Sequence, residues 1–560
     1  MRAHGEDQPQ RHGSPNDALE ELELDEHRGS QRIEVGTSST HDPGERRVSP
    51  VGYLEYADGD VKGCVCYPTD LAETTVLTER PGRAGRAPIV FLAHGNHATH
   101  CDPSDPGQEW APGCGGTPPA GWVEILNHRG YDYFQKALAK MGIISVSVDC
   151  SATNGLAGGP SNIENRADLI IASIAHFRGL DADPTSILHE RIDFRLVGLV
   201  GHSRGGEAVV LVPEVMDMPH VDIKAVIALA PTCFGASSGQ PEGYSFMTIL
   251  PAGDGDVWSN DGARLYDQAR PGPIKCQLYV HRANHNYFNQ HWHRDDAHGP
   301  RAMSRRDHET VLEVYGSAFF CHVLLRDAGA VRLLSGHAVP TGVPAGDVHL
   351  SFEWRDALTV DHHEDGNGIA LNSLNLPTTQ SMGLTADEYA FRQGAGSFNS
   401  SFFGNTIGMV AECQGRNGQF RSRLGASTDL SGGEVWIRAA EVYQLPSLPS
   451  GATGFELGLE DGNGLVAWVD SNVVGGLPRP YHRGPDDVVT PSIMRDATKT
   501  MLKTLRFPAY SFAAHSNGVR IGDVMAILLR CNRGDARPLA FDDLQLVYGA
   551  QCLEGPDEGE

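Results

Sequence analysis

The chain has 560 residues, of which 40% are hydrophobic and 21% charged, so it has the composition of a globular protein and the length of several domains. Asp and Glu outnumber Lys and Arg by 71 to 45, which gives a formal net charge of −26. Such an acidic surface repels phosphate backbones and anionic headgroups, so we expect neither nucleic acid nor an anionic membrane as a partner. No stretch approaches the roughly 20 apolar residues of a membrane-spanning helix.

The first 50 residues are rich in Glu, Asp, His, Ser and Gly and show almost no apolar clustering. We therefore expect residues 1–50, and the acidic end 551–560, to be disordered. The opening segment also lacks the apolar stretch of a secretory signal, which predicts a cytoplasmic protein, while secretion by another route stays open. The sequence predicts no particular oligomeric state.

The 11 cysteines form an odd count in a long chain, which does not indicate a disulfide framework. Cys64 and Cys66 lie two apart in an expected strand and are poorly placed to bond each other. Cys101 and Cys114 flank a loop and are placed to bond in an oxidising compartment, whereas in the cytosol they would stay free thiols. No Cys/His spacing resembles a zinc site, so the sequence predicts neither a metal nor a cofactor.

Between residues 51 and 336, short apolar runs alternate with segments of helical periodicity. Continuous apolar strands separated by helices favour a doubly wound, mostly parallel sheet that is covered on both faces. The expected strands cover 61–67, 88–93, 143–148, 196–200, 225–230, 246–250 and 276–280, and the expected helices 133–140, 165–177 and 307–326.

Four Pro and Gly residues mark a linker over 337–346, and alternating strands with turn residues follow over 347–550. This pattern predicts an all-β, antiparallel, jelly-roll-like sandwich, which is also a candidate for glycan contact. The pentapeptide Glu-Asp-Gly-Asn-Gly occurs at 364–368 and 460–464, where it favours tight turns, with a calcium loop as the alternative. The expected strands cover 434–439, 455–459, 465–469, 502–507, 524–529 and 539–547.

The expected strand at 196–200 leads into Gly201-His202-Ser203-Arg204-Gly205, and a helix-compatible segment follows at once. A G-x-S-x-G pentapeptide between a strand and a helix is typical of a nucleophile elbow, which lifts one serine hydroxyl clear of the backbone. The residues two before and two after the serine must be small there, and both are glycine. The same pattern also arises by chance in a chain with 65 glycines, but its context favours Ser203 as a nucleophile.

A serine nucleophile needs a histidine base and a carboxylate that orients the histidine. Asp254 and Asp256 follow the expected strand at 246–250, and we prefer Asp256, with Asp254 in reserve, or else both only cap a turn. His285 follows the last expected strand of this unit and is the expected base. The nearby histidines at 281, 291 and 293 stay open as alternatives.

The oxyanion of an acyl-transfer intermediate needs two preorganised N–H donors. The backbone of Arg204 supplies one of them, and the loop after the strand at 88–93 supplies the other. We assign the second donor to the backbone of Asn96, with His97 in reserve, against the simpler interpretation of a glycine turn. His94, His97 and Trp258 are the expected lining of the substrate pocket.

Residues 51–336 resemble the α/β-hydrolase superfamily. The elbow at 201–206 is similar to that of chlorophyllases, and the segments around Asp256 and at 283–285 resemble platelet-activating-factor acetylhydrolases, dienelactone hydrolases and cutinase-like polyesterases. The resemblance implies a metal-independent serine esterase that cleaves a small or polymeric carboxylic ester or lactone through an acyl-serine. The loop at 97–122, the insert at 289–304 and the C-terminal unit depart from those families.

Two other functions stay open. The first is acyl transfer by the same three residues, with an alcohol or an amine in place of water. The second is a non-catalytic carbohydrate-binding or scaffold protein, which the expected β-sandwich suggests. The intact order of serine, aspartate and histidine argues against the second.

Overall fold

The computed structural model describes most of the chain between residues 51 and 548. The predicted disordered ends, 1–50 and 551–560, lie outside the described residues. The described ranges are 51–69, 85–112, 116–155, 160–234, 239–270, 272–294, 302–344, 346–391, 404–413, 418–442, 453–482, 498–514, 518–531 and 538–548.

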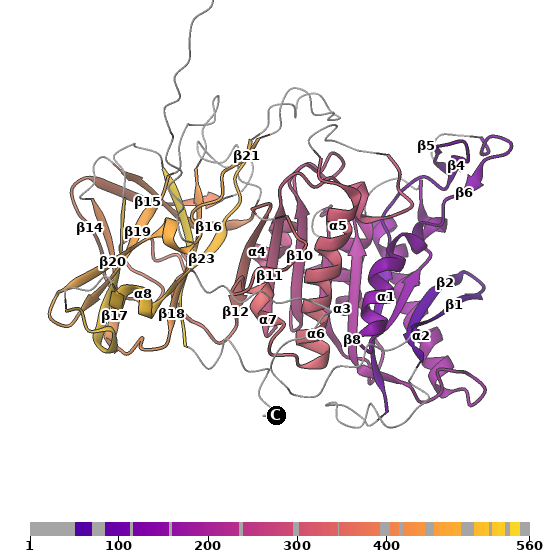
Figure 1. The fold of residues 1–560 in the computed structure, drawn as a ribbon, viewed down its shortest axis with the longest axis horizontal. Helices are drawn as coiled ribbons and strands as arrows, with labels where there is room; N and C mark the ends of the chain where they lie inside the picture. Colours follow the sequence, from indigo (N-terminus) through magenta and orange to yellow (C-terminus); the bar gives the residue numbers. More distant parts are fainter. Residues whose placement is uncertain are drawn as a thin grey trace, which may run out of the picture.

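A nine-stranded sheet in the order β1-β2-β7-β3-β8-β9-β10-β11-β12 forms the centre of the N-terminal part (Figure 1). The strands from β7 to β11 run parallel to their neighbours, whereas β1, β2 and β12 pair antiparallel at the two edges. The inner strands are apolar throughout because both faces of the sheet are covered. The bounds are β1 Val51–Asp58, β2 Val61–Pro68, β3 Ala87–Ala93, β7 Ile144–Val148, β8 Ile192–His202, β9 Ile223–Leu229, β10 Ser245–Pro251, β11 Ile274–Val280 and β12 Val348–Trp354.

Helices cover the two faces of this sheet. One face packs against α1 and α6, and the other against α2, α3 and α4, so each face has its own apolar core. A π-helical turn, Leu312–Gly316, joins α5 to α6 and makes them one continuous rod where the sequence predicted a helix over 307–326. The bounds are α1 Asp132–Lys140, α2 Pro160–Ala182, α3 Arg204–Val215, α4 Gly262–Gln268, α5 Arg305–Val311, α6 Ser317–Leu325 and α7 Val331–Leu334.

The C-terminal part consists of antiparallel sheets. A six-stranded sheet, β15-β16-β25-β18-β23 with β13 beside β25, packs against a five-stranded sheet, β14-β17-β24-β19-β20, around one apolar core. The first sheet contains β13 Leu358–Asp361, β15 Leu384–Phe391, β16 Thr406–Cys413, β18 Glu434–Glu441, β23 Lys503–Pro508 and β25 Leu539–Val547. The second contains β14 Thr378–Gln380, β17 Gln419–Thr428, β19 Phe455–Asp461, β20 Val466–Asp470 and β24 Val524–Cys531, and α8 Ala509–Ala514 lies beside it.

Two small antiparallel sheets stand apart from these. One, β5-β4-β6, comes from the loop at 97–122 and its flank, and the other is β21-β22. Among the described residues, none of the helices has both the length and the apolar character that crossing a bilayer requires. The bounds are β4 His100–Asp102, β5 Asp105–Trp110, β6 Val123–Glu124, β21 Tyr481–His482 and β22 Thr498–Lys499.

The predicted fold class is wrong in the form given above. The large sheet is mixed rather than doubly wound and parallel, and its edge strand β12 comes from residues that the sequence assigned to a separate sandwich. The rest of the chain forms several antiparallel sheets rather than one appended jelly roll. Hydropathy shows that a strand is buried but not in which direction it runs, so the antiparallel edges were invisible in the sequence.

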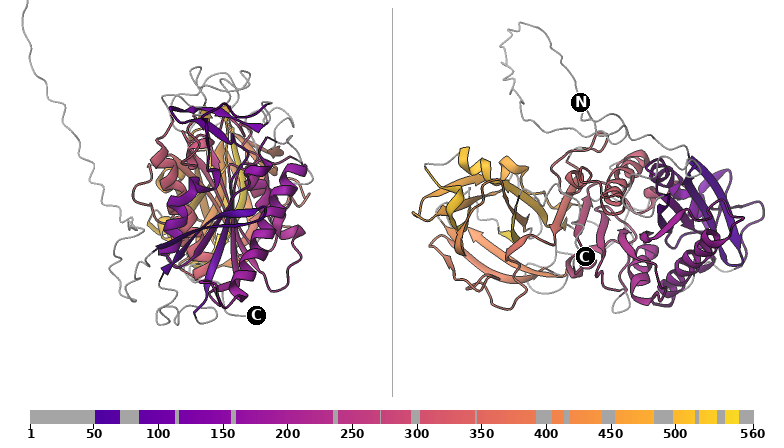
Figure 2. Two further views of the ribbon diagram at one scale, coloured as in Figure 1. Left: turned by 90° about the vertical axis from the view of Figure 1, so that its right-hand side faces the viewer. Right: turned by 90° about the horizontal axis from the view of Figure 1, so that it is seen from below.

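The two parts of the chain are in direct contact (Figure 2). Trp436 from β18 and Val547 from β25 belong to the same apolar core as β11 and α6. Ser351 on β12 donates a hydrogen bond to the carbonyl of Leu502, beside β23, at 2.8 Å. The C-terminal sheets are therefore packed against the nine-stranded sheet and not merely tethered to it.

Candidate active site

Ser203 lies at the sharp turn between β8 and α3. Its backbone has φ 58° and ψ −124°, a strained conformation that L-residues rarely adopt and that costs about 1–3 kcal/mol. The amide of Ser203 donates to the carbonyl of Leu229 at 2.9 Å, and its carbonyl accepts from the amides of Gly206 and Thr232. These hydrogen bonds stabilise the strained backbone of Ser203, and strained residues of this kind cluster at functional sites.

The glycines around Ser203 have no room for a side chain. A Cβ on Gly201 would lie 1.9 Å from the carbonyl oxygen of Gly205, and one on Gly205 would lie 2.4 Å from that of Ala93. Gly95, in the loop after β3, is equally restricted, because its Cβ would lie 2.4 Å from the Cβ of Ser203. The loop after β3 therefore touches the serine directly.

His285 lies in the loop after β11 and is 1% exposed. Its Nδ1 is 2.8 Å from Oδ2 of Asp254, which is also 1% exposed. The ring of His285 lies 4.9 Å, centroid to centroid, from that of His202, the residue before Ser203. The structure thus brings Ser203, His285 and an aspartate to the same edge of the sheet.

The aspartate at Nδ1 is the reserve candidate, Asp254, and the preference for Asp256 is corrected. Oδ1 of Asp254 accepts the amides of Asp256 and Val257, at 2.9 and 2.6 Å, so this short turn keeps the carboxylate inside. The side chain of Asp256 is 64% exposed, and its Oδ2 lies 3.7 Å from Nε2, the other ring nitrogen of His285. The amide of Gly253 donates to the carbonyl of Ala283 and joins the two loops.

The alternative histidines lie elsewhere. His281, at the end of β11, packs against His349 and Tyr481, and burial lowers its pKa to about 4. His291 and His293 lie in the insert after η5, Asn286–Phe288, where burial lowers the pKa of both rings. His285, in contrast, contacts Asp254 at 2.8 Å and therefore stays the predicted base.

The expected oxyanion donors lie on two segments, the loop after β3 and the start of α3. Asn96 accepts the amide of Gly155 through its side chain at 2.9 Å, which fixes the loop, and Arg204 begins α3 directly after the serine. Because Gly95 touches Ser203, both backbone segments border the serine. Asn96 and Arg204, with His97 in reserve, therefore stay the predicted donors.

Two of the three expected pocket residues have clear surroundings. His94 is fully buried; its Nε2 accepts the amide of Cys150 and its Nδ1 donates to the carbonyl of Gly95. Burial lowers its pKa, so a neutral ring braces the loop and does not line a pocket, which corrects that prediction. His97 contacts Glu109 on β5 at 3.1 Å, and Trp258 is half-buried on the loop of the two aspartates.

Sequence reasoning missed an aromatic stack around the histidines. Trp292, fully buried in the insert, stacks on His97 at 4.4 Å and on His202 at 4.6 Å, and lies nearly parallel to His285 at 6.3 Å. Its Nε1 donates to Oδ1 of Asn127 at 2.6 Å. In the sequence, the insert at 289–304 was the only indication of these contacts, because no local pattern shows where a tryptophan in a loop will pack.

Two further residues hold the nucleophile and the base in place. The hydroxyl of Tyr131 lies 2.8 Å from Nδ1 of His202. Burial lowers the pKa of His202 well below its usual range. His308 on α5 accepts the amide of Asn284, the residue before His285, at 2.9 Å. His202 is therefore neutral, and His308 anchors the residue before His285.

Glu207 lies in the first turn of α3. It is buried, and it accepts the hydroxyl of Thr232 at 2.7 Å and the amide of Phe234 at 2.8 Å. It therefore supports the loop after β9, whose Thr232 amide also binds the carbonyl of Ser203.

A cavity of about 540 Å³ lies between the carboxyl end of α3, α4 and the residue before β16. None of Ser203, His285 and Asp254 lines it, so it is separate from the candidate site. Its lining is mostly polar and consists of Glu214, Cys233, Gly239, Gln240, Arg264, Gln268 and Asn405.

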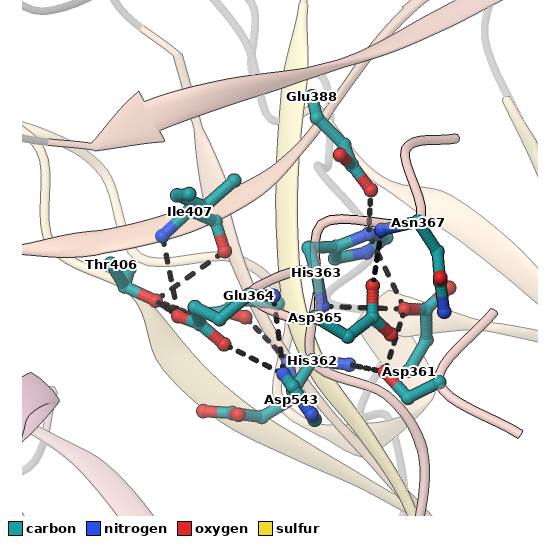
Figure 3. A network of polar contacts seen from close by, with 12 residues as sticks. Asp361, His362, His363, Glu364, Asp365, Asn367, Glu388, Thr406, Ile407 and Asp543 are labelled. Carbon is teal, nitrogen blue, oxygen red and sulfur yellow. Dashed lines mark hydrogen bonds and ion pairs between the residues drawn. The ribbon is translucent and has the colours of Figure 1, made fainter. Parts of the chain in front are cut away.

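The repeated pentapeptide forms two different structures. At 460–464 it is the hairpin between β19 and β20, as the turn interpretation predicted, with Asp461 accepting the amides of Asn463 and Leu465. At 364–368 it lies in a polar cluster after β13, where Glu364 binds Thr406 and His362, and His363 binds Glu388 (Figure 3).

These carboxylates pair with histidine and threonine side chains of the same cluster. In the part of the chain that the structure describes, no group of three or more His, Cys, Asp or Glu side chains is arranged to hold a metal ion.

Cys413 on β16 and Cys531 on β24 form a disulfide that joins the two C-terminal sheets, with a Cα–Cα separation of 6.1 Å. The sequence did not predict this bond. Cys64, Cys66 and Cys101 are free and buried, and Cys114 lies outside the described residues.

Comparison with known proteins gives no family for this chain. No family model matches it, and no curated protein is significantly similar to it. The case for function therefore rests on the geometry of the site.

Proposed function

We propose that the chain is a serine hydrolase that cleaves a carboxylic ester or lactone through an acyl-serine intermediate. Ser203 is the nucleophile, His285 the general base and Asp254 the carboxylate that orients it. The carrying observation is the buried 2.8 Å contact between His285 Nδ1 and Asp254, beside a serine held at φ 58°. A buried imidazole–aspartate pair next to a strained serine is the arrangement that activates a hydroxyl.

The proposed reaction uses each of these groups in turn. Asp254 accepts Nδ1–H of His285 and leaves Nε2 to take the proton of Ser203 as its oxygen attacks the ester carbonyl. The backbone amides of Arg204 and Asn96 stabilise the oxyanion, and a donor of this type lowers the activation free energy by about 3–4 kcal/mol. The imidazolium then protonates the leaving alcohol, and water, activated by His285, releases the acid and restores the serine.

The order Ser203, Asp254, His285 along the chain is the order found in α/β-hydrolase esterases. We propose a similarity to these esterases in the catalytic reaction and not in the fold. Glycan binding by the C-terminal sheets and acyl transfer to another acceptor are separate proposals, for which the described contacts give no specific support.

Ser203→Ala tests the function. Removing the hydroxyl should abolish turnover of p-nitrophenyl acetate and covalent labelling by a fluorophosphonate probe, since both need the serine oxygen. Ser431→Ala, an exposed serine of the C-terminal part, is the matched control and should keep both. Turnover that persists in Ser203→Ala with an unchanged melting temperature would refute the proposal.

A further inference from the structure

The imidazole of His285 has a carboxylate at each of its two ring nitrogens. Oδ2 of Asp254 lies 2.8 Å from Nδ1, and Oδ2 of Asp256 lies 3.7 Å from Nε2. The first pair is buried, whereas the side chain of Asp256 is 64% exposed. The two aspartates therefore differ in role, although both belong to one turn and the amide of Asp256 donates to Asp254.

Nε2 is the atom that must receive the proton of Ser203 in the proposed reaction. A carboxylate beside a ring nitrogen favours the form of the ring in which that nitrogen carries a proton. With Nδ1–H already directed at Asp254, a proton on Nε2 makes the ring an imidazolium, which cannot act as a base. Asp256 thus competes with Ser203 for the same nitrogen.

We infer that Asp256 is a positioning residue whose negative charge favours a proton on Nε2 of His285 in the resting enzyme and so suppresses ester turnover on the acidic side of neutrality. The inference rests on the proposed function. The proton balance is simple: Nε2–H is first lost to water, the free Nε2 then takes the proton of Ser203, and the same proton passes to the leaving alcohol. During the reaction Asp256 also stabilises the imidazolium. Its main effect is therefore to lower the fraction of enzyme with a free Nε2, and it affects the turnover rate of that active fraction less.

The other groups around His285 do not provide this effect. His202, from the elbow, is held neutral by burial, and Trp292 is uncharged. His308 acts on the backbone of Asn284 through a nitrogen that accepts a hydrogen bond. Arg204 is a cation that interacts electrostatically with Asp256, so it cannot itself favour a proton on Nε2. Asp256 is thus the exposed charge beside Nε2, where solvent and salt can reach it.

The test is the pH profile of kcat/KM for p-nitrophenyl acetate with wild type and Asp256→Asn. The acidic midpoint should move to lower pH by about 0.5–1 pH unit in the variant, because an exposed carboxylate at this distance acts through partly screened charge. The rate on the alkaline plateau should fall less than about tenfold. Added NaCl should lower the wild-type midpoint and leave that of the variant in place.

Asp217→Asn, which removes one exposed carboxylate after α3, is the matched control and should leave the midpoint unchanged. Coincident midpoints for Asp256→Asn and wild type would overturn the inference. So would a loss of about 10³–10⁴-fold at every pH, since that is expected for the triad acid and hence for Asp254→Asn. Turnover in Ser203→Ala would instead refute the proposed function, so the two failures are distinguishable.

Discussion

Gly95 sets how closely the loop after β3 can approach the nucleophile. An alanine there would place its Cβ 2.4 Å from Cβ and 3.1 Å from Oγ of Ser203, and 2.9 Å from the carbonyl oxygen of His202. Neither neighbour is the end of a flexible chain, so the loop or the serine must move. Because a displacement of about 1 Å can cost about 10²-fold in rate, Gly95→Ala should lower kcat by that order.

Esterase kinetics and a thermal melt check this prediction together. Gly107→Ala in β5 is the matched control, because the nearest atom to its Cβ would be 3.5 Å away and both activity and stability should survive. A Gly95→Ala enzyme with wild-type kcat would show that the loop does not position the serine.

At the residue scale, the two aspartates show which features of the site the residue types alone do not determine. The sequence placed both after the right strand, and it placed His285 after the next one. It could not show which carboxylate turns inward, because that depends on the bonds from Asp254 to the amides of residues 256 and 257. The buried state of His94 was hidden for the same reason, since its partner, the amide of Cys150, is 56 positions away.

At the scale of elements, most inner strands of the large sheet were predicted from their apolar runs. The edge strand β12 was not assigned to that sheet, because its alternating sequence is equally suited to a free antiparallel sheet and only the pairing with β11 decides. The stack of Trp292 on His97 and His202 joins two loops and the end of β8 and therefore has no local signature.

The disulfide between β16 and β24 makes an element-scale prediction. It closes a loop over a sequence separation of 118 and links the two C-terminal sheets. The double variant Cys413→Ser/Cys531→Ser should lose about 2–4 kcal/mol in the free energy of unfolding, since the unfolded chain gains freedom. Urea denaturation should show that loss, and a reductant should destabilise wild type but not the variant.

Equal unfolding midpoints for oxidised wild type and the variant would contradict this prediction.

At the scale of the whole molecule, a buried ion cluster joins the two parts. Arg438 on β18 is buried and lies 3.2 Å from Asp267, in the last turn of α4, and 3.3 and 3.1 Å from Asp542 and Asp543 of β25. Its guanidinium also lies 4.8 Å from the ring centre of Tyr266. Burial raises the pKa of Asp267 and of Asp542, and the charge of Arg438 opposes that rise.

Arg438→Met should therefore destabilise the whole chain and not only the C-terminal sheets. It leaves two buried carboxylates without their counter-charge, which costs about 3–5 kcal/mol when one partner of a buried pair is removed. The deficit should shrink as the pH falls, because a carboxyl with a raised pKa in the folded state takes up a proton and no longer needs the cation.

Urea denaturation of Arg438→Met at neutral and acidic pH measures both effects. Arg355→Met is the matched control: that side chain is 54% exposed, pairs with Asp356, which is 55% exposed, and should change stability by less than about 1 kcal/mol at either pH. If the pairing couples the two parts, ester turnover should disappear at the same urea concentration as the C-terminal fold. Turnover that outlasts the C-terminal sheets in wild type would show that the interface does not stabilise the site.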